Sequence, residues 1–311
     1  MPVAPQYPST GDVNVGQTKQ KNMTRHKFGG PWTEIKLEVL KKYLRFYTQA
    51  LGKRFELLYI DAFAGTGNRT ENIPAAPIMS EEEHSITYDG SARIALKIVP
   101  PFNKYLFIEN NTKRFKELSK LKKEFSNHYI EITKGDANEI IKNMAKKKIW
   151  NTDKYRGVIF LDPYGLEIDW HTLEAIADTK SFDVWFLFSI SGVYRQASLD
   201  FDKMEQYKKE KLTRLFGTDD WEDTFYGTSK QKTLFGDATV KERKVDVRQM
   251  EDWVLNRLKG CFPYVSKPLA LPSSGTQLYS LFFCVSNSSR KAIELAKKVA
   301  DHILQQQIVA G

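Results

Sequence analysis

Four short apolar runs, spread from residue 57 to residue 161, each lead to an acidic residue. The runs and their acids are Leu57–Ile60 with Asp61, Tyr105–Ile108 with Glu109, Tyr129–Ile132 with Asp136 a few residues on, and Gly157–Leu161 with Asp162. Each run has the length and apolarity of a buried strand, and each is followed by a segment compatible with a helix. This alternation predicts a βαβαβαβ order and a parallel sheet. Because ligands bind outside the carboxyl ends of the strands in such sheets, the four acids are predicted to line one crevice.

The first run leads directly into a turn that contains an acid and two glycines, Asp61-Ala-Phe-Ala-Gly-Thr-Gly67. Gly65 and Gly67 allow the backbone to come close to a ligand where any Cβ would intrude. An acid at the end of a buried strand can bind a cationic or hydroxyl-bearing group. Short glycine patterns also arise by chance, so the turn indicates a nucleotide-like cofactor site because of the strands around it.

Two motifs, Asp61-x-Phe63-x-Gly65-x-Gly67 and Asp162-Pro163-Tyr164-Gly165, resemble those of Rossmann-like methyltransferases. The enzymes in question use S-adenosylmethionine to methylate an exocyclic amino nitrogen. The resemblance implies an α/β class I methyltransferase fold. Such a fold has a mostly parallel seven-stranded sheet with a C-terminal antiparallel hairpin and helices on both faces.

At finer grain the chain resembles the bacterial three-Cys-motif partner proteins, over roughly residues 25 to 311. The segments that carry this resemblance are Phe28–Lys36, Tyr59–Gly67 and Gly90-Ser91. The family resemblance implies a partner protein that bears three cysteines.

The resemblance also implies which residues bind the methionine part of S-adenosylmethionine. Asp61, Phe63, Gly65 and Gly67 would surround it, and the backbone near Ala64 would approach the sulfonium.

The nucleoside part of the cofactor would be bound at the next two strand ends. Glu109 would accept hydrogen bonds from both ribose hydroxyls, which suits a carboxylate with two acceptor oxygens. Asp136 would accept from the adenine amino group, and the Ala137 N–H would donate to a ring nitrogen. Glu109 and Asp136 could instead be helix N-caps or surface acids.

Upstream of the first strand, apolar residues recur at helical spacing from Thr33, which predicts an amphipathic helix with Thr33 as its N-cap. The resemblance implies that Thr33 and Lys36 attract the methionine carboxylate at this helix start. Trp32 would then cover the ligand. The alternative is an ordinary helix cap with a packed tryptophan.

The Asp162-Pro163-Tyr164-Gly165 turn is the predicted catalytic element. Asp162 would accept the hydrogens of the target amine, Pro163 would stiffen the turn, and Tyr164 would stack on the flipped base. The commonest form of this motif is Asp-Pro-Pro-aromatic. The present form is closer to the Asp-Pro-Phe-Gly of tRNA guanosine N2 methyltransferases, which leaves the identity of the base open. A simple surface turn is the alternative.

Composition along the chain predicts a disordered tail over residues 1–24 and a single domain over 25–311. Residues 68–90 are predicted to form a long flap without regular structure. Residues 190–245 are an insertion rich in aromatic and basic residues. They could form a surface where bases stack and phosphates are neutralised, or a small core of their own. Near the C-terminus, residues 264–271 and 277–285 predict an antiparallel hairpin, and residues 289–306 a final helix.

The formal net charge of +9 favours a polyanionic partner such as nucleic acid. Two cysteines and five scattered histidines predict neither a disulfide framework nor a metal site. No window approaches the roughly 18 apolar residues of a membrane span, so we expect a soluble, cytoplasmic protein without a membrane partner. The sequence does not indicate the oligomeric state.

Together these features predict an S-adenosylmethionine-dependent N-methyltransferase that acts on an exocyclic amino group of a nucleic-acid base, in RNA or DNA. One alternative is a protein glutamine N-methyltransferase, because the same acid and aromatic side chain could hold an amide. Another is a catalytically silent module that has the same fold and serves a partner protein.

Overall fold

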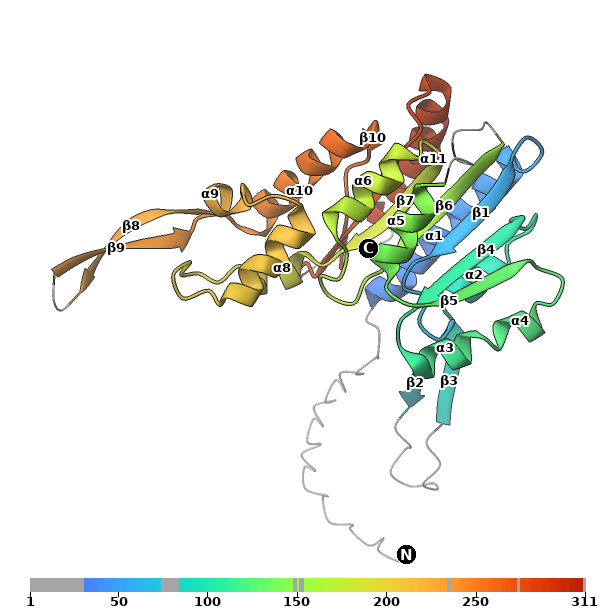
Figure 1. Cartoon of the computed structure of the whole chain (residues 1–311), viewed down its shortest axis with the longest axis horizontal. Coiled ribbons are helices and arrows are strands. Elements are labelled where there is room, and N and C mark those ends of the chain that lie inside the picture. The colour runs from blue at the N-terminus through green and yellow to red at the C-terminus, as the bar shows by residue number, and fades with distance from the viewer. Residues whose placement is uncertain are drawn as a thin grey trace, which may run out of the picture.

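A mostly parallel sheet forms the centre of the molecule (Figure 1). The computed structural model describes residues 31–73, 84–147, 150, 154–233, 236–272 and 275–309, so the predicted tail lies outside the described residues. The strands of this sheet are β1 (Glu56–Asp61), β4 (Lys104–Glu109), β5 (Ile130–Lys134), β6 (Tyr155–Leu161), β7 (Phe182–Phe188), β10 (Tyr264–Val265), β11 (Leu269–Leu271) and β12 (Tyr279–Val285).

The strand order is β10-β12-β7-β6-β1-β4-β5, with β11 also paired to β12. The pairs among β5, β4, β1, β6 and β7 are parallel, whereas β12 is antiparallel to β7 and to both β10 and β11. Here β10 and β11 can be counted as one interrupted edge strand, and the seven strands numbered 1 to 7 along the chain. Read from β5 to the opposite edge, the order is then 3-2-1-4-5-7-6. This confirms the predicted class I methyltransferase fold, including the antiparallel hairpin at its C-terminal end.

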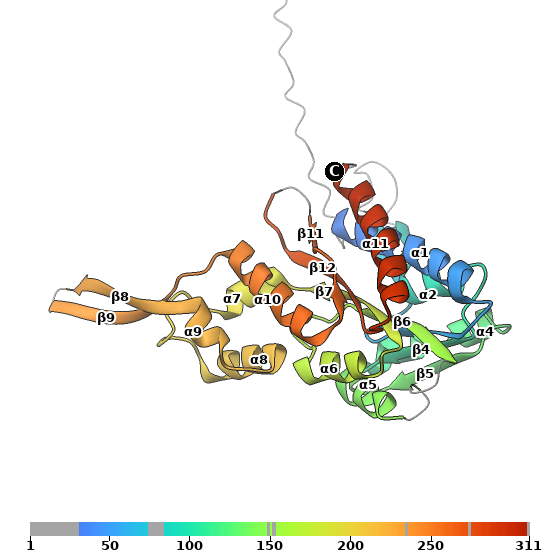
Figure 2. The same ribbon diagram turned by 90° about the horizontal axis from the view of Figure 1, so that it is seen from above.

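Helices cover both faces of the sheet (Figure 2). One face packs against α1 (Pro31–Leu51), α2 (Ser91–Leu96), α3 (Thr112–Leu118), α4 (Leu121–Glu124) and α11 (Arg290–Val309). The other packs against α5 (Ala137–Ala145), α6 (Trp170–Asp178), α7 (Ile190–Gln196), α8 (Gln206–Phe216), α9 (Trp221–Phe225) and α10 (Val247–Cys261).

Strand β7 illustrates why the sequence forms a sheet that is covered on both sides. Its side chains alternate between the two cores, with Val184 and Phe186 in one and Trp185 and Leu187 in the other. A strand that is buried on both faces has an almost continuous apolar sequence, because neither face meets water.

Two two-stranded ribbons lie outside the main sheet, and the sequence predicted neither. β2 (Asn68–Ile73) pairs with β3 (His84–Asp89), and β8 (Tyr226–Thr233) pairs with β9 (Gly236–Arg243). The predicted flap without regular structure is therefore wrong for residues 68–73 and 84–89, while residues 74–83 lie outside the described residues. In a two-stranded ribbon the backbone groups that face the partner strand are paired and the others can bond to water, so a polar sequence does not exclude it.

The insertion over residues 190–245 forms α7, α8, α9 and the β8–β9 ribbon, which projects from the body of the molecule (Figure 1). Five of its aromatic side chains are buried and extend the core beneath α10: Phe201, Phe216, Trp221, Phe225 and Tyr226. Tyr194 and Tyr207 are exposed. The small-core alternative therefore applies to most of these aromatic residues, and the surface alternative to two of them.

The N-terminal helix begins earlier than the sequence predicted. α1 starts at Pro31, so Thr33 lies inside its first turn and the prediction of Thr33 as N-cap is wrong. Proline is favoured at the first helical position because its missing N–H would have no partner there. In the described part of the chain, no helix is both long and apolar enough to cross a bilayer.

Candidate active site

Parallel pairing brings the carboxyl ends of β5, β4, β1 and β6 to the same rim of the sheet. Asp61 and Glu109 are the last residues of β1 and β4, Asp162 directly follows β6, and Asp136 follows β5 by two residues. All four predicted acids therefore lie at one rim.

Asp61 is the most deeply buried of these acids, with an exposed fraction of 0%. Neither of its carboxylate oxygens has a hydrogen-bond partner among the described residues, and the same is true of the Tyr59 hydroxyl on the same strand. A buried polar group in a native structure is normally hydrogen-bonded, so the Asp61 oxygens indicate a place for a donor that the described residues do not supply.

The pKa of Asp61 is raised from 3.8 to about 7, mainly by burial and in smaller part by the nearby Asp162 carboxylate. The Ser91 hydroxyl, the Phe63 N–H and Lys36 lower this pKa. Ser91 and Phe63 lie close to the carboxylate without making a hydrogen bond of ordinary geometry to it. Near neutral pH this carboxyl group is therefore poised between its charged and neutral forms.

Lys36 reaches the rim from α1. Its Nζ donates to Oδ2 of Asp162 at 2.5 Å, with exposed fractions of 11% and 26% for the two side chains. Lys36 also lies close enough to Asp61 to lower its pKa. The structure thus brings Lys36, Asp61 and Asp162 together, while Thr33 is half-buried three residues earlier on α1.

The turn after β1 is held by backbone hydrogen bonds to both neighbouring strands. The Ala62 N–H donates to the Phe160 carbonyl at 3.1 Å, and the Ala64 N–H donates to the Ile108 carbonyl at 3.0 Å. These bonds fix the turn over the boundary between β6, β1 and β4.

The two glycines of the turn have different surroundings, although both are in the left-handed region. Gly67 has a φ of 76°, and a Cβ there would lie 2.7 Å from Cδ1 of Leu121. Gly65 has a φ of 62°, and a Cβ there would meet no atom of the described residues within 4 Å. Gly67 is therefore required for packing, whereas Gly65 borders open space. Phe63 is half-buried beside them.

Glu109 is 6% exposed and accepts a hydrogen bond from the Asn111 N–H through Oε1, at 2.7 Å. Asn111 caps α3, because its side chain accepts from the N–H groups of Lys113 and Arg114. Glu109 is therefore neither a helix N-cap nor a surface acid, and its position is consistent with a ligand role.

Asp136 caps α5, because its Oδ1 accepts from the Glu139 N–H at 3.1 Å. The N-cap alternative thus applies to Asp136. Ala137 is the first residue of α5 and is buried. Its N–H belongs to the first turn, where backbone donors have no partner within the helix.

The catalytic turn has a buried base and an exposed tip. Pro163 is buried, whereas Tyr164 is 56% exposed and Gly165 has a φ of 67°. The Arg114 guanidinium lies over the Tyr164 ring, 4.4 Å from its centroid. The ion pair of Asp162 and the burial of Pro163 distinguish this segment from a simple surface turn.

Glu167 is a member of this rim that the sequence analysis missed. Burial, Asp136 and Glu109 raise its pKa, while Lys211 and Arg114 lower it, so its carboxyl group lies near all four. The sequence feature that could have identified Glu167 is its position five residues after Asp162, in the loop that follows β6.

Trp32 packs against Tyr279, with 6.3 Å between the ring centroids, and is partly buried against the core. The packed-tryptophan alternative therefore applies to it. Within the described ranges, no group of three or more His, Cys, Asp or Glu side chains could hold a metal ion.

A separate cavity of about 860 Å³ lies at the amino ends of β6 and β7, at the opposite rim of the sheet. Asp183 lines it and accepts from the Tyr43 hydroxyl at 2.6 Å. Burial raises the pKa of Asp183 from 3.8 to about 7. Asp183 is half-buried, whereas Asp61 is fully buried, and it lies at the rim opposite to the four acids described above.

No family model matches the chain, and no curated protein matches it. Among solved structures, it is similar to the protein LPL1258 from Legionella pneumophila, of family DUF519, with 11% identity and a TM-score of 0.51 over 90% of this chain and 94% of that one. It is also similar to Trm1 from Pyrococcus horikoshii in complex with S-adenosyl-L-methionine, with 11% identity and a TM-score of 0.37 over 89% and 75% of the two chains. A further similar structure is an S-adenosylmethionine-dependent methyltransferase from Clostridium acetobutylicum, with 12% identity and a TM-score of 0.36 over 79% and 92%. At these identities the likeness concerns the fold.

Proposed function

We propose that this chain is an S-adenosylmethionine-dependent N-methyltransferase that acts on an exocyclic amino group of a nucleic-acid base. The observation that carries the proposal is Asp61, a fully buried carboxylate without hydrogen-bond partners among the described residues, at the rim that also bears Glu109 and Asp162. A buried carboxylate with a purely structural role would accept hydrogen bonds from donors within the protein.

The residues at the rim fit this cofactor. Asp61 offers buried acceptors for the ammonium of the methionine part, and the open space at Gly65 allows a ligand to approach the backbone. Glu109 and the start of α5 at Asp136 and Ala137 lie at the next two strand ends, where the ribose and adenine would bind. When bound, S-adenosylmethionine supplies an electrophilic methyl group on its sulfonium.

Asp162 prepares the nucleophile. The lone pair of an exocyclic amine is delocalised into its ring, and a carboxylate that accepts the amine hydrogens draws the nitrogen towards tetrahedral geometry and frees that pair. Lys36 holds Oδ2 of Asp162, so Oδ1 is the acceptor for the amine. Positioning of this kind can supply much of the rate of a methyl transfer.

Tyr164 positions the base. An exposed ring with Arg114 over one face offers its other face for stacking, and stacking on aromatic side chains is how extruded bases are held. The net charge of +9 supports a nucleic-acid substrate over a protein glutamine.

The Lys36–Asp162 ion pair favours one second candidate, the catalytically silent module. A carboxylate neutralised by a buried lysine could be structural.

From the sequence resemblance we also propose that the chain is a three-Cys-motif partner protein, that it acts in the cytoplasm, and that it works with a protein bearing three cysteines. Co-purification with that protein tests this last point.

Isothermal titration with S-adenosylmethionine tests the function. We expect Asp61→Asn to abolish measurable binding, because the buried acceptors for the cofactor's ammonium lose their charge. Asp183→Asn is the control, since the pKa of Asp183 is also raised to about 7 by burial but this acid lies at the opposite rim, and the variant should bind like the wild type.

Transfer of a labelled methyl group to total RNA and DNA then separates the candidates. Asp162→Asn should retain cofactor binding and lose at least about 100-fold in transfer, the usual scale for a positioned catalytic group. A wild type that binds the cofactor but labels neither RNA nor DNA would favour the silent module or the protein substrate. A wild type that does not bind the cofactor would contradict the proposal.

A further inference from the structure

Helix α8 turns one polar face away from the core. Leu212, Leu215 and Phe216 are buried on one side of this helix. Tyr207, Lys211 and Arg214 follow one another at intervals of four and three residues, so they share the other side. We call these three residues the α8 face.

The α8 face lies beside the loop that carries the proposed catalytic turn. Arg214 forms an ion pair with Asp169 in that loop, with 3.0 Å between Nε and Oδ1. Lys211 lies near Glu167, because it lowers the pKa of that carboxyl group. Both acids follow Asp162 by only a few residues, so the α8 face continues from the rim where the target base would be bound.

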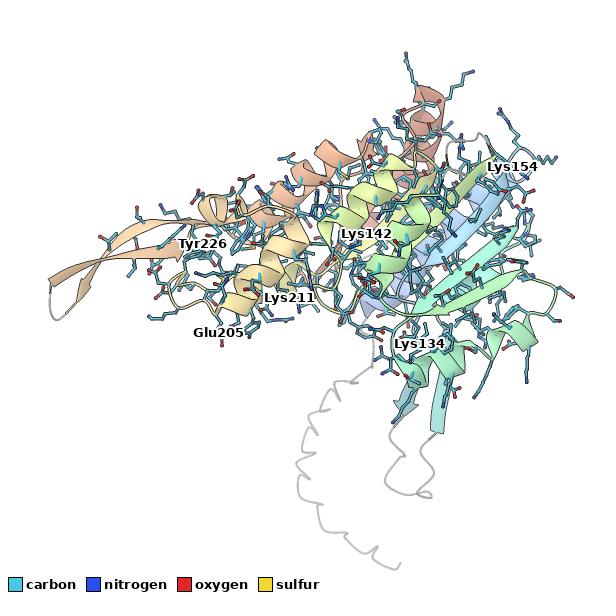
Figure 3. The ribbon with its side chains drawn as sticks, viewed as in Figure 1. Lys134, Lys142, Lys154, Glu205, Lys211 and Tyr226 are labelled. Carbon is cyan, nitrogen blue, oxygen red and sulfur yellow. The ribbon has the colours of Figure 1, made fainter. Side chains whose placement is uncertain are left out.

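The C-terminal end of α8 is fixed to the rest of the molecule. Arg257 of α10 donates to the Phe216 carbonyl at 2.6 Å, and the Trp221 indole N–H donates to the Thr213 hydroxyl at 3.0 Å. Figure 3 shows Lys211 on this helix and Lys142 on α5, the helix that packs against α6. The C-terminal part of α8 is thus held against α9 and α10.

Charge and exposure indicate what kind of molecule binds to the α8 face. Tyr207 is 59% exposed, and four of the eleven residues of α8 are basic against one acid. At the proposed catalytic turn, Arg114 lies over the exposed ring of Tyr164. Exposed aromatic rings alternating with cations suit a single nucleic-acid strand, whose bases stack while its phosphates are neutralised.

Resting on the proposed function, we infer that the α8 face binds the single-stranded segment next to the target base. The strand runs from Tyr164 over Lys211 to Tyr207. A duplex would keep its bases in their own stack and could not use the tyrosine ring, so unpaired nucleotides are preferred.

Fluorescence anisotropy with a labelled single-stranded RNA, a single-stranded DNA and a duplex of the same sequence tests this inference. We expect the double variant Tyr207→Ala/Lys211→Glu to weaken binding of the single strands at least about tenfold. The slope of log K against log salt should fall by about one, because one phosphate contact is lost.

The chain offers a matched control at the opposite rim. Tyr129 is 63% exposed, and Lys104, at the amino end of β4, lies 5.2 Å from its ring centroid. The variant Tyr129→Ala/Lys104→Glu makes the same chemical change, and it should alter binding less than about twofold, as for groups outside an interface.

Equal weakening by both variants, no weakening by the α8 variant, or tighter binding of the duplex than of the single strands would each overturn the inference. Titration of S-adenosylmethionine into the wild type and the same variants distinguishes a failure of the cofactor proposal from a failure of the strand-binding inference. If the α8 variant loses strand binding while even the wild type does not bind the cofactor, the cofactor proposal fails and the strand-binding surface stands.

Discussion

At the scale of single residues, Asp61 is the group whose chemistry is most constrained by its surroundings. Burial raises its pKa to about 7, and the chain provides no hydrogen bond to either oxygen among the described residues. Lys36, the nearest cation that affects it, is paired with Asp162. An incoming cationic group would therefore find a buried acceptor that accepts no hydrogen bond from the described residues.

This arrangement predicts a pH dependence of cofactor binding. A ligand cation favours the charged form of Asp61, whereas below pH 7 the free protein holds this carboxyl group protonated. Binding at low pH must therefore release a proton, so the affinity should rise between pH 6 and pH 8, at most about tenfold per pH unit. Titration calorimetry at several pH values measures this.

Asp183→Asn serves as the control, since it removes an acid at the opposite rim whose pKa is also raised to about 7 by burial. It should leave the pH dependence intact. A flat affinity of the wild type across this range would show that Asp61 does not contact the cationic part of the ligand.

The pairing of Lys36 with Asp162 was not predictable from the sequence, because 126 residues separate the partners. The identity of each residue as a candidate was predictable, since Asp162 follows an apolar run and the family resemblance implied Lys36. What each side chain contacts depends on how α1 packs across the sheet.

At the scale of secondary-structure elements, the two glycines in the turn after β1 have different roles, one in packing and one in ligand binding. Gly67 is surrounded by Leu118 and Leu121, whereas the Cβ direction of Gly65 is open. Both have positive φ, so an alanine at either position carries a backbone cost of roughly 1–2 kcal/mol.

We predict that Gly67→Ala and Gly65→Ala fail in different ways. Gly67→Ala adds a steric clash to the backbone cost and should destabilise the fold by roughly 2–4 kcal/mol. Gly65→Ala should cost only the backbone term, yet it should weaken S-adenosylmethionine binding at least about tenfold, because its methyl group occupies ligand space. Urea unfolding and calorimetry separate the two effects. Equal losses of stability with unchanged binding would contradict this assignment.

The strands and helices of the main sheet could be predicted because their apolar runs have a clear period and length. β6 ends at Leu161, like the predicted run Gly157–Leu161, and β12 ends at Val285, like the predicted segment 277–285. The ribbons could not be predicted in this way, since sequences such as Asn68–Ile73 and Tyr226–Thr233 show no sustained alternation of apolar and polar residues. The start of α1 was misplaced because Thr33 is a good N-cap residue, although Pro31 carried the stronger signal.

At the scale of the whole molecule, the parallel sheet has two rims with different contents. The carboxyl rim carries Asp61, Glu109, Asp136 and Asp162, and the insertion with α8 begins there, at the end of β7. This common rim was predictable, because parallel strands that end in acids must present them on one side. Which aromatic residues of the insertion are buried was not predictable, since composition does not specify tertiary packing.

The most direct test is a crystal structure of the protein with S-adenosylhomocysteine, the product form of the cofactor. We predict the ligand at the carboxyl rim over Gly65, with its amino group on Asp61, its ribose on Glu109 and its sulfur facing Asp162. A ligand bound in the cavity beside Asp183, or one at the carboxyl rim that leaves the Asp61 oxygens without a donor, would contradict the proposed site.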